Sequence, residues 1–273
     1  MKKLSSIITF FVFAFLYAPI VVMILFSFNS TKSTAVFTGF SLHYYAELFK
    51  DEAIFNALKN SVLVATVSSL LSTLLGTLAA VGIDKLKKKW LQSAVMTVTN
   101  IPMMNPDIVT GVSMMLLFYG AINLMSIDGG LNIVTLIIAH TTFCLPYVIL
   151  SVLPRVQQHD QSLTEAALDL GCTPIQTFFK IELPGMIPGI FSGLIMAFTL
   201  SLDDFVISNF TVMGVETLPL HIFSMVKKDV SPKIYSLSTL MFLAILILLM
   251  ISNFVGNSDK SSNKKRVRKG GKF

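Results

Sequence analysis

A short polar stretch, Glu165–Pro184, has the sequence EAALDLGCTPIQTFFKIELP. It carries charged residues, a central glycine and two prolines, and an apolar run lies on each side of it, at 131–153 and 186–208. Each run is long enough to cross a bilayer as a helix, which takes about 20 residues. We therefore predict a compact helical hairpin in a loop of a membrane protein.

The composition of the whole chain also indicates a membrane protein. The 273 residues are 53% hydrophobic and 13% charged, with a mean hydropathy of +0.74. Ordinary soluble domains carry about 25% charged residues. Little length remains for a soluble domain of ordinary size, so we expect one all-α membrane domain with short loops.

Six apolar segments are long enough to span the hydrocarbon core. The first follows Lys2 and Lys3 and resembles a signal peptide, but its apolar part is too long and no clear cleavage site follows. We interpret it as an uncleaved first span. The six predicted spans are Ile7–Phe28, Ser61–Ile83, Ala94–Tyr119, Leu131–Leu153, Met186–Ser208 and Tyr235–Val255.

The basic residues predict the orientation of these spans. If both termini lie inside, 15 of the 21 Lys and Arg residues fall in inner segments, which fits the preference for positive charge in cytoplasmic loops. The hairpin is then cytoplasmic. A basic tail at 256–273 could bind lipid headgroups or nucleic acid; we interpret it as a solvated topology signal and expect no nucleic-acid partner.

Cysteine and histidine spacing gives no sign of a disulfide framework or a metal site. Two cysteines and four histidines occur, and each histidine is most simply a loop or packing residue. The residues are Cys144, Cys172, His43, His140, His159 and His221.

The hairpin has sequence signals for two helices and a turn. Ser162 and Glu165 have the spacing of a capping box at the start of the first helix. Leu163, Ala166, Ala167 and Leu170 follow at helical spacing on one face, which the two alanines leave low enough for another surface to approach.

The turn and the second helix follow directly. Gly171 suits the left-handed residue that ends a helix, and Thr173–Gln176 forms a second capping box with Pro174 at the first helical position. We expect Pro184 to end the second helix. On composition alone, the alternative is an amphipathic loop on the membrane surface in which Glu165 is only a cap.

The spacing of the fixed residues resembles the EAA loop of bacterial binding-protein-dependent ABC importers. Glu165-Ala166-Ala167, Gly171 and the group Ile181, Leu183 and Pro184 fill that pattern. The resemblance implies a type I importer permease fold with six transmembrane helices, in which this hairpin docks into a groove of an ATPase subunit. It places the permease core at 57–255, with the loop at about 155–185, after a first span and outer loop at 1–56.

The motif for nucleotide binding is absent. No Walker A pattern, G-x-x-x-x-G-K-[ST], occurs in the chain. We therefore expect no cofactor on this chain and no catalytic role for it; ATP and Mg²⁺ would bind a separate ATPase subunit.

Further stretches resemble the permease subunits of spermidine/putrescine importers of PotC type. They are MMNPDIVTGVS, HTTFCLPYVI, FTLSLDDFVISNF and LPLHIFSMVKKDVSP. With the hairpin, the similarity runs over nearly the whole chain, and its least typical parts are the first thirty residues, the outer loop and the tail. It implies a second permease subunit of PotB type, ATPase subunits and an extracytoplasmic polyamine-binding protein as partners.

Three carboxylates fall inside the predicted spans. Asp107, Asp203 and Asp204 would lie in the outer half of the bilayer, and no Lys or Arg shares their spans. An ionisable group inside a span suggests a functional site, and a mobile polyamine would supply the missing positive charge. Pro102 and Pro106 would free backbone carbonyls beside Asp107.

Structural roles for these carboxylates remain open at this point. Asp107 could cap the helix that restarts after Pro106, and Asp203 and Asp204 could lie in a surface loop. Adjacent helical residues point about 100° apart, so at most one of the pair faces a pore squarely; we favour Asp203 slightly.

Two outer-face residues complete the predicted substrate pathway. Tyr44 could make a cation–π contact with an ammonium group, although such aromatics more often form the interfacial belt. Glu216 could receive substrate or contact the binding protein. Tyr44 lies in FSLHYYAELFKDEAIFNALKN (40–60), which we interpret as one short amphipathic helix at the outer surface.

The sequence thus predicts one half of a gated polyamine pathway that works by alternating access. Two alternatives stay open: an ABC permease for another cationic or small solute, and an ion-coupled secondary carrier that uses Asp107 and Asp203 as proton relays. The hairpin argues against the carrier, because a carrier needs no ATPase dock.

Overall fold

The computed structural model describes residues 2–31, 36–126, 129–228 and 232–250, and these residues form helices and connecting turns with no β-strand. The predicted basic tail at 256–273 and the end of the sixth predicted span lie outside them. The chain divides into two compact units, Met1–Leu58 with Leu218–Leu246 and Lys59–Thr217 with Ile247–Phe273.

Six helices in the described residues are long and apolar enough to cross a membrane, so the all-α class with six spans is confirmed. Each predicted span corresponds to one of them, with different ends. The six are Ser6–Ser27, Glu52–Asp84, Asp107–Met125, Ile133–Gln157, Pro174–Asp203 and Pro232–Met250.

The third predicted span is wrong as a single helix. Helix α4 covers Lys89–Met104 and α5 covers Asp107–Met125, with an extended residue, Asn105, between them. Pro106 causes the break, because a proline disfavours the helical conformation of the residue before it. The placement of Asp107 in the outer half of the bilayer assumed one unbroken helix from Ala94, so it no longer follows from the span.

The fifth predicted span continues too far. Helix α9 is Leu183–Asp203; Asp204 is extended, and a short helix α10 follows at Val206–Thr211. The predicted span Met186–Ser208 thus joined two helices across a break at Asp204.

The outer segment at 40–60 does not form one helix; it contains a short helix and the start of a second, longer one. Helix α2 is His43–Leu48, and α3 begins at Glu52 and runs to Asp84. The Asp51 carboxylate accepts hydrogen bonds from the backbone N–H groups of Ala53 (3.0 Å) and Ile54 (3.4 Å). This cap explains why α3 starts nine residues before the predicted span.

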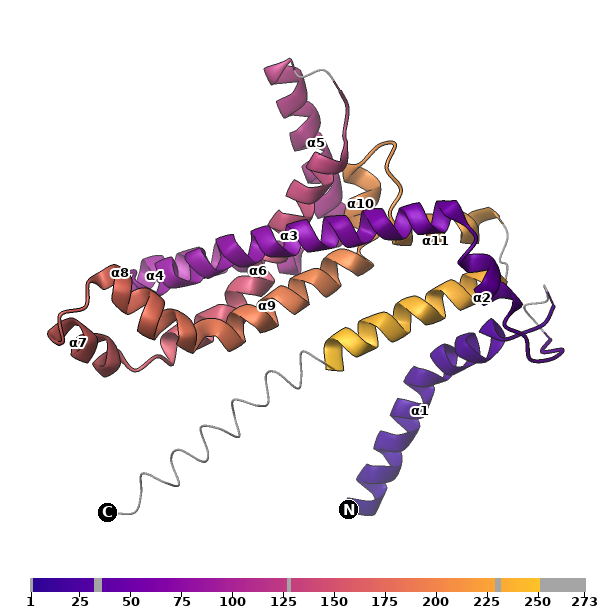
Figure 1. The fold of residues 1–273 in the computed structure, drawn as a ribbon, viewed down its shortest axis with the longest axis horizontal. Helices are drawn as coiled ribbons and strands as arrows, with labels where there is room; N and C mark the ends of the chain where they lie inside the picture. The colour runs from indigo at the N-terminus through magenta and orange to yellow at the C-terminus, as the bar shows by residue number, and fades with distance from the viewer. Residues whose placement is uncertain (1, 32–35, 127–128, 229–231, 251–273) are drawn as a thin grey trace. The chain divides into compact units, whose positions relative to one another are not determined.

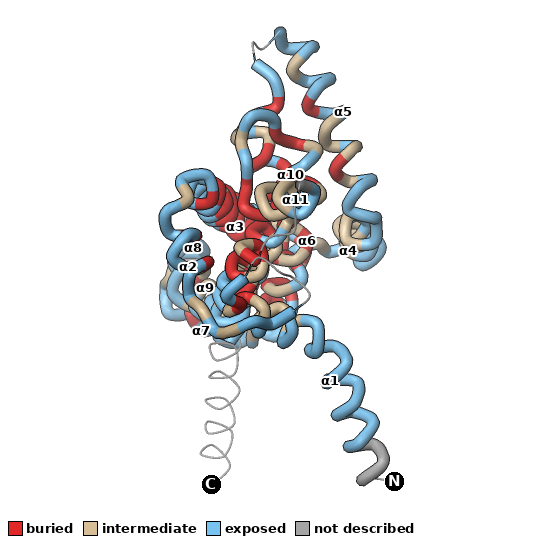
Figure 2. Tube along the Cα trace, turned by 90° about the vertical axis from the view of Figure 1, so that its right-hand side faces the viewer, coloured by how far each residue is buried: buried red, intermediate tan, exposed pale blue. Residues whose placement is uncertain are grey.

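The larger unit is built around α6, Ile133–Gln157, which packs along α9 (Figure 1). Much of the buried surface of this unit lies on α3 and α6 (Figure 2). Gly76 of α3 and Gly193 of α9 both approach Val148 of α6. A Cβ built on Gly76 would lie 2.7 Å from Val148 Cγ1, and a Cβ built on Gly193 would lie 3.3 Å from the same atom. Small residues therefore let three helices meet closely at one point.

The smaller unit contains α1 (Lys2–Ser27), α2, the first turns of α3, α11 (Leu218–Lys228) and most of the helix Pro232–Met250. Its apolar core joins α2, α3, α11 and the last helix through Leu48, Ile54, Ala57, Leu218 and Leu237. Lys233 donates to the Asp51 carboxylate, and the Ser236 hydroxyl donates to the Ser27 carbonyl at 3.0 Å.

Candidate functional site: coupling hairpin and pathway carboxylates

The first hairpin helix, α7, is Gln161–Asp169 and its cap is Asp160. The Asp160 carboxylate accepts from the backbone N–H of Ser162 at 3.0 Å, and hydrogen bonds from Ser162 hold the pKa of Asp160 below its usual value. The predicted capping box of Ser162 and Glu165 is therefore wrong, since the helix begins one residue before Ser162. Two capping residues stand two positions apart here, and the earlier one is used.

The turn forms as predicted. Gly171 has φ +86°, and its N–H donates to the Leu168 carbonyl at 2.9 Å, while the N–H of Cys172 donates to Ala167 at 3.0 Å. Thr173 then caps α8 (Pro174–Thr177) in a reciprocal capping box with Gln176, and Pro174 occupies the first turn. Left-handed backbone at Gly171 and the second capping box are both confirmed.

The second hairpin helix does not end at Pro184. A π-helical turn, Phe178–Glu182, joins α8 to α9, and the N–H of Leu183 donates five residues back to Phe178. Pro184 lies in the first turn of α9, where its missing N–H is tolerated. The hairpin and the following span are thus one helical run, with Ile181 in the π-turn and Leu183 at the start of α9.

The predicted apolar face of α7 divides between the inside and the outside of the hairpin. Ala167 is buried, and α7 packs against α8 and the π-turn. Glu165 and Ala166 are exposed. The exposed apolar side chains of the hairpin include Leu163, Leu170, Ile175 and Phe179, and Leu170 is 86% exposed. This surface on the hairpin is available for a protein partner.

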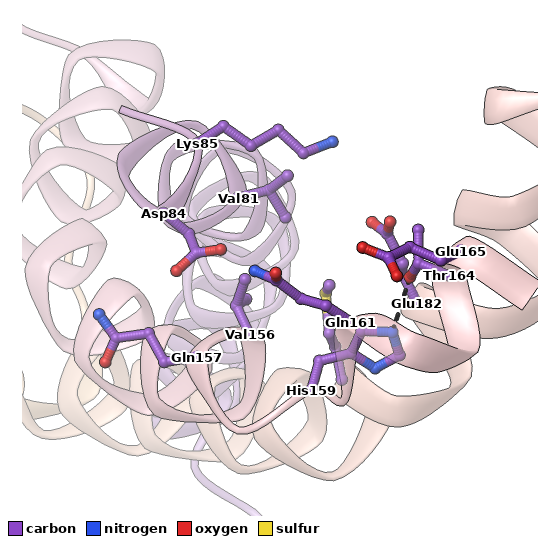
Figure 3. A pocket seen from close by; sticks show the side chains of 11 residues that line it. Val81, Asp84, Lys85, Val156, Gln157, His159, Gln161, Thr164, Glu165 and Glu182 are labelled. Atoms are coloured by element: carbon purple, nitrogen blue, oxygen red, sulfur yellow. Dashed lines mark hydrogen bonds between the residues drawn. The ribbon is translucent and has the colours of Figure 1, made fainter. Parts of the chain in front are cut away.

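A cleft of about 300 Å³ lies at the base of the hairpin (Figure 3). It brings carboxylates from three elements together with one lysine, and His159 Nε2 lies 3.1 Å from the Thr164 hydroxyl at its edge. Movement of α7 would alter this cleft, because α7 supplies one wall. The charged residues lining it are Asp84, Lys85, Glu165 and Glu182.

Asp107 is the first residue of α5 and is exposed. Its place in the first turn is favourable for a carboxylate, because the positive end of the helix dipole lies there. The carboxylate thus marks the break that Pro106 makes between α4 and α5.

The two adjacent carboxylates at the end of α9 have different surroundings. Asp203 is the last residue of α9 and is exposed. The side chain of Asp204 is only 7% exposed, and its carboxylate caps α10 by accepting from the N–H groups of Ile207 (3.3 Å) and Ser208 (2.8 Å). The expectation that all three carboxylates lack a partner is therefore wrong for Asp204.

The missed partner is His140, whose side chain is 1% exposed. Its Nε2 lies 3.4 Å from Asp204 Oδ2 and 3.0 Å from the Ser208 hydroxyl, and its Nδ1 lies 2.6 Å from the Ser201 hydroxyl. His140 is an ionisable residue in the middle of a span, which is the signal that singled out the aspartates. It was missed because each histidine was interpreted as a loop or packing residue and tested only for a metal-binding role.

The remaining pathway candidates lie elsewhere. Glu216 is exposed, and its backbone carbonyl accepts from Asn60 Nδ2 at 3.0 Å. Tyr44 belongs to the smaller unit, where it is buried and contacts His43 edge-on. The larger unit therefore contains Asp107, Asp203, Asp204 and Glu216, while Tyr44 belongs to the smaller unit.

Comparison with known proteins identifies the family. Residues 72–269 match the model of the binding-protein-dependent transport system inner membrane component. The chain belongs to this family of ABC importer permeases. It is 37% identical over 257 residues to the putrescine transport system permease protein PotI of Escherichia coli strain K12, covering 94% of this chain and 90% of PotI. It is 38% identical over 254 residues to the spermidine/putrescine transport system permease protein PotC of Haemophilus influenzae, covering 92% and 96%.

Solved structures support the same fold. A bacterial ABC transporter for import of the acidic polysaccharide alginate matches with a TM-score of 0.70 and 18% identity, over 95% of this chain and 94% of that one. The alginate transporter bound to a periplasmic protein carrying an alginate pentasaccharide matches with a TM-score of 0.68. The chain is therefore a multi-pass membrane permease component, and such permeases are non-catalytic subunits.

Proposed function

We propose that this permease forms half of the translocation pathway of an ATP-driven importer for polyamines such as spermidine and putrescine. The observation that carries the proposal is identity of 37–38% to PotI and PotC over more than nine-tenths of the chain. An exposed carboxylate at each of two helix breaks, Asp107 and Asp203, provides the negative charge that a polyamine requires.

The proposed partners follow from the family and the hairpin. A second permease subunit of PotB type would complete the pathway, and an extracytoplasmic polyamine-binding protein would deliver substrate. ATPase subunits, which would hold ATP and Mg²⁺, would dock on the exposed apolar residues of the hairpin. Both termini would then be cytoplasmic. The lipid bilayer would surround the six spans.

The proposed mechanism is alternating access. ATP-driven closure of the ATPase subunits would move the hairpin, and α9 continues from the hairpin without a loop. The helix breaks beside Asp107 and Asp203 would then open to one side of the membrane at a time. Tyr44 and Glu216 are retained as candidate contacts near the outer face.

Uptake of radiolabelled putrescine and spermidine by the complete transporter tests the substrate. Asp107→Asn and Asp203→Asn keep the side-chain size and remove the charge, so we expect uptake to fall more than tenfold for the more important site, equivalent to over about 1.4 kcal/mol. Polyamine binding to the separate binding protein should be unchanged.

Three outcomes would contradict parts of this proposal. Normal uptake in both variants, with equal membrane levels, would remove the carboxylates from the pathway. Loss of uptake when the proton gradient is dissipated at constant ATP would support an ion-coupled carrier, and absence of polyamine uptake by the wild type would support another solute.

Docking of the ATPase is tested by adding a charge to the hairpin. Leu170→Glu places a carboxylate on a side chain that is 86% exposed, so the permease should fold while its capture of the ATPase falls at least tenfold. Ser162→Glu, on the exposed first turn of the same helix, is the matched control and should leave capture unchanged. Ala167→Glu should lower both stability and capture, because Ala167 is buried. Equal capture by Leu170→Glu and wild type would contradict the dock.

A further inference from the structure

The break between α9 and α10 brings four helices to one buried polar group. The group consists of Ser68 of α3, His140 of α6, Ser201 of α9, Ser208 of α10 and Asp204, which lies in the break itself. The two serines nearest α6, Ser201 and Ser208, are 4% and 0% exposed. We call this set the His140 network.

The imidazole of His140 bridges the two helices on either side of the break. One ring nitrogen, Nδ1, lies 2.6 Å from Ser201 on α9, and the other, Nε2, lies 3.0 Å from Ser208 on α10. The Nε2 atom is also 3.4 Å from Asp204 Oδ2. A single side chain therefore fixes the end of one helix relative to the start of the next.

The serine hydroxyls extend the network to α3. Ser68 donates its proton to the Val64 carbonyl at 2.7 Å, and the Ser68 and Ser201 hydroxyls are 3.0 Å apart. Because the proton of Ser68 is already used, Ser201 donates to Ser68, and Nδ1 of His140 then donates to Ser201. Loss of the ring would therefore leave Ser201 without this donor, which makes the network sensitive to substitution of His140.

The Asp204 carboxylate has little capacity left for a substrate. Its Oδ2 accepts from the N–H (2.8 Å) and hydroxyl (3.1 Å) of Ser208, and its Oδ1 accepts from the N–H of Ile207 at 3.3 Å. The side chain is 7% exposed, whereas the neighbouring Asp203 is an exposed residue. The His140 ring faces this buried carboxylate, so its removal would leave Asp204 with one contact fewer in a buried site, which is costly for a charged group.

We propose that His140 is a positioning residue: by holding Asp204 and Ser208 it fixes the α9–α10 break, so that Asp203 and not Asp204 presents its carboxylate to the substrate. This inference rests on the proposed function. It assigns a structural role to one of the two adjacent aspartates and substrate contact to the other. Asp204 then organises the break, and Asp203 contacts the ammonium group of the polyamine.

A double-mutant cycle on the purified complete transporter tests the positioning. His140→Leu and Asp204→Asn should each lower the melting temperature by about 3 °C or more, and the double variant should lower it by less than the sum. Thr141→Val is the matched control, because Thr141 is the next residue of α6, is buried, and donates only within its helix, to Ile137. Asp203→Asn should leave the melting temperature unchanged.

Uptake kinetics separate positioning from stability alone. Loss of folded transporter lowers only the maximal rate, whereas a displaced Asp203 also raises the half-saturating concentration of loaded binding protein. We expect a rise of about threefold or more for His140→Gln, whose amide supplies a donor and an acceptor and so maintains the fold better than His140→Leu.

Defined results would overturn the inference. Additive melting shifts for His140→Leu and Asp204→Asn would show that the two side chains act independently. An unchanged half-saturating concentration in His140→Gln would reduce the network to a packing role, and loss of uptake without a melting shift in Asp204→Asn would make Asp204 the substrate ligand. The melting cycle needs no polyamine, so failure of the polyamine assignment itself would appear separately, as absence of uptake by the wild type.

Discussion

Asp51 combines two stabilising interactions in one side chain. Its carboxylate caps α3 through the N–H groups of Ala53 and Ile54 and accepts a hydrogen bond from Lys233. The hydrogen bond from Lys233 is the main cause that holds the pKa of Asp51 below its usual value. Both residues lie in the smaller unit, so the interaction joins the start of α3 to the start of the last helix.

Substitutions of Asp51 should separate the cap from the charge. Asp51→Asn keeps a capping side chain and loses the ion pair, so we expect a loss of less than about 1 kcal/mol in the free energy of unfolding. Asp51→Ala also loses the cap and should cost about 1 kcal/mol more. Thermal melting of the purified protein checks both, and equal losses for the two variants would contradict a capping role.

The same residue predicts a pH dependence. Since the folded-state pKa of Asp51 is lowered, the native state binds fewer protons than the unfolded state, and the ion pair adds stability above about pH 4. That contribution disappears as the pH falls through the lowered folded-state pKa. In Asp51→Asn the loss of stability below about pH 4 should be smaller than in wild type.

At the scale of helices, the position of glycine decides how closely neighbours pack. On α3, Gly76 lies against Val148 of α6, where an added Cβ would lie 2.8 Å from Val148 Cβ, whereas a Cβ added to Gly82 would meet no atom of another helix within 4 Å. The two glycines therefore share a helix and differ only in whether another helix approaches.

Alanine at these two glycines should have opposite effects. Gly82→Ala should stabilise by up to about 1 kcal/mol, because alanine favours the helix more than glycine does. Gly76→Ala should destabilise by about 1–3 kcal/mol, because the added methyl group overpacks the contact with Val148. Val148→Ala in the Gly76→Ala background should recover part of the loss. Melting temperatures of the three variants check this, and a stabilised Gly76→Ala would show that the helices move apart freely.

Across the whole molecule, the proposed function requires one orientation, in which the hairpin and both termini would lie on the cytoplasmic side. The two cysteines offer a direct test, since Cys144 is buried and Cys172 lies in the hairpin turn with partial exposure. A membrane-impermeant thiol reagent should leave Cys172 unlabelled in intact cells and label it in permeabilised cells. Cys172→Ser is the control, and labelling of Cys172 from outside would reverse the orientation.

Hydropathy was enough to predict the six spans, because long apolar runs have no other stable environment. The hairpin turn was also predictable, since Gly171 and the Thr173–Gln176 box act locally. Pro106 is a sequence signal for the break at Asn105, but the apolar length of 94–119 was given more weight and a single span was predicted. The break at Asp204 has no proline or glycine; it depends on His140, which is 64 residues away in sequence and becomes adjacent only in the folded chain. Local chemistry was therefore visible in the sequence, and pairings between helices were not.

The helical run from Pro174 to Asp203 is 30 residues long, which corresponds to about 45 Å. One end lies in the hairpin and the other at the break beside Asp203. The run therefore connects the two sites through continuous helix, with no loop between them. A flexible loop in the same place would absorb a displacement of a few ångströms. Here, the helix continues through the π-helical turn at Phe178–Glu182 into α9, so we expect a displacement of the hairpin to be transmitted to the end of α9 beside Asp203.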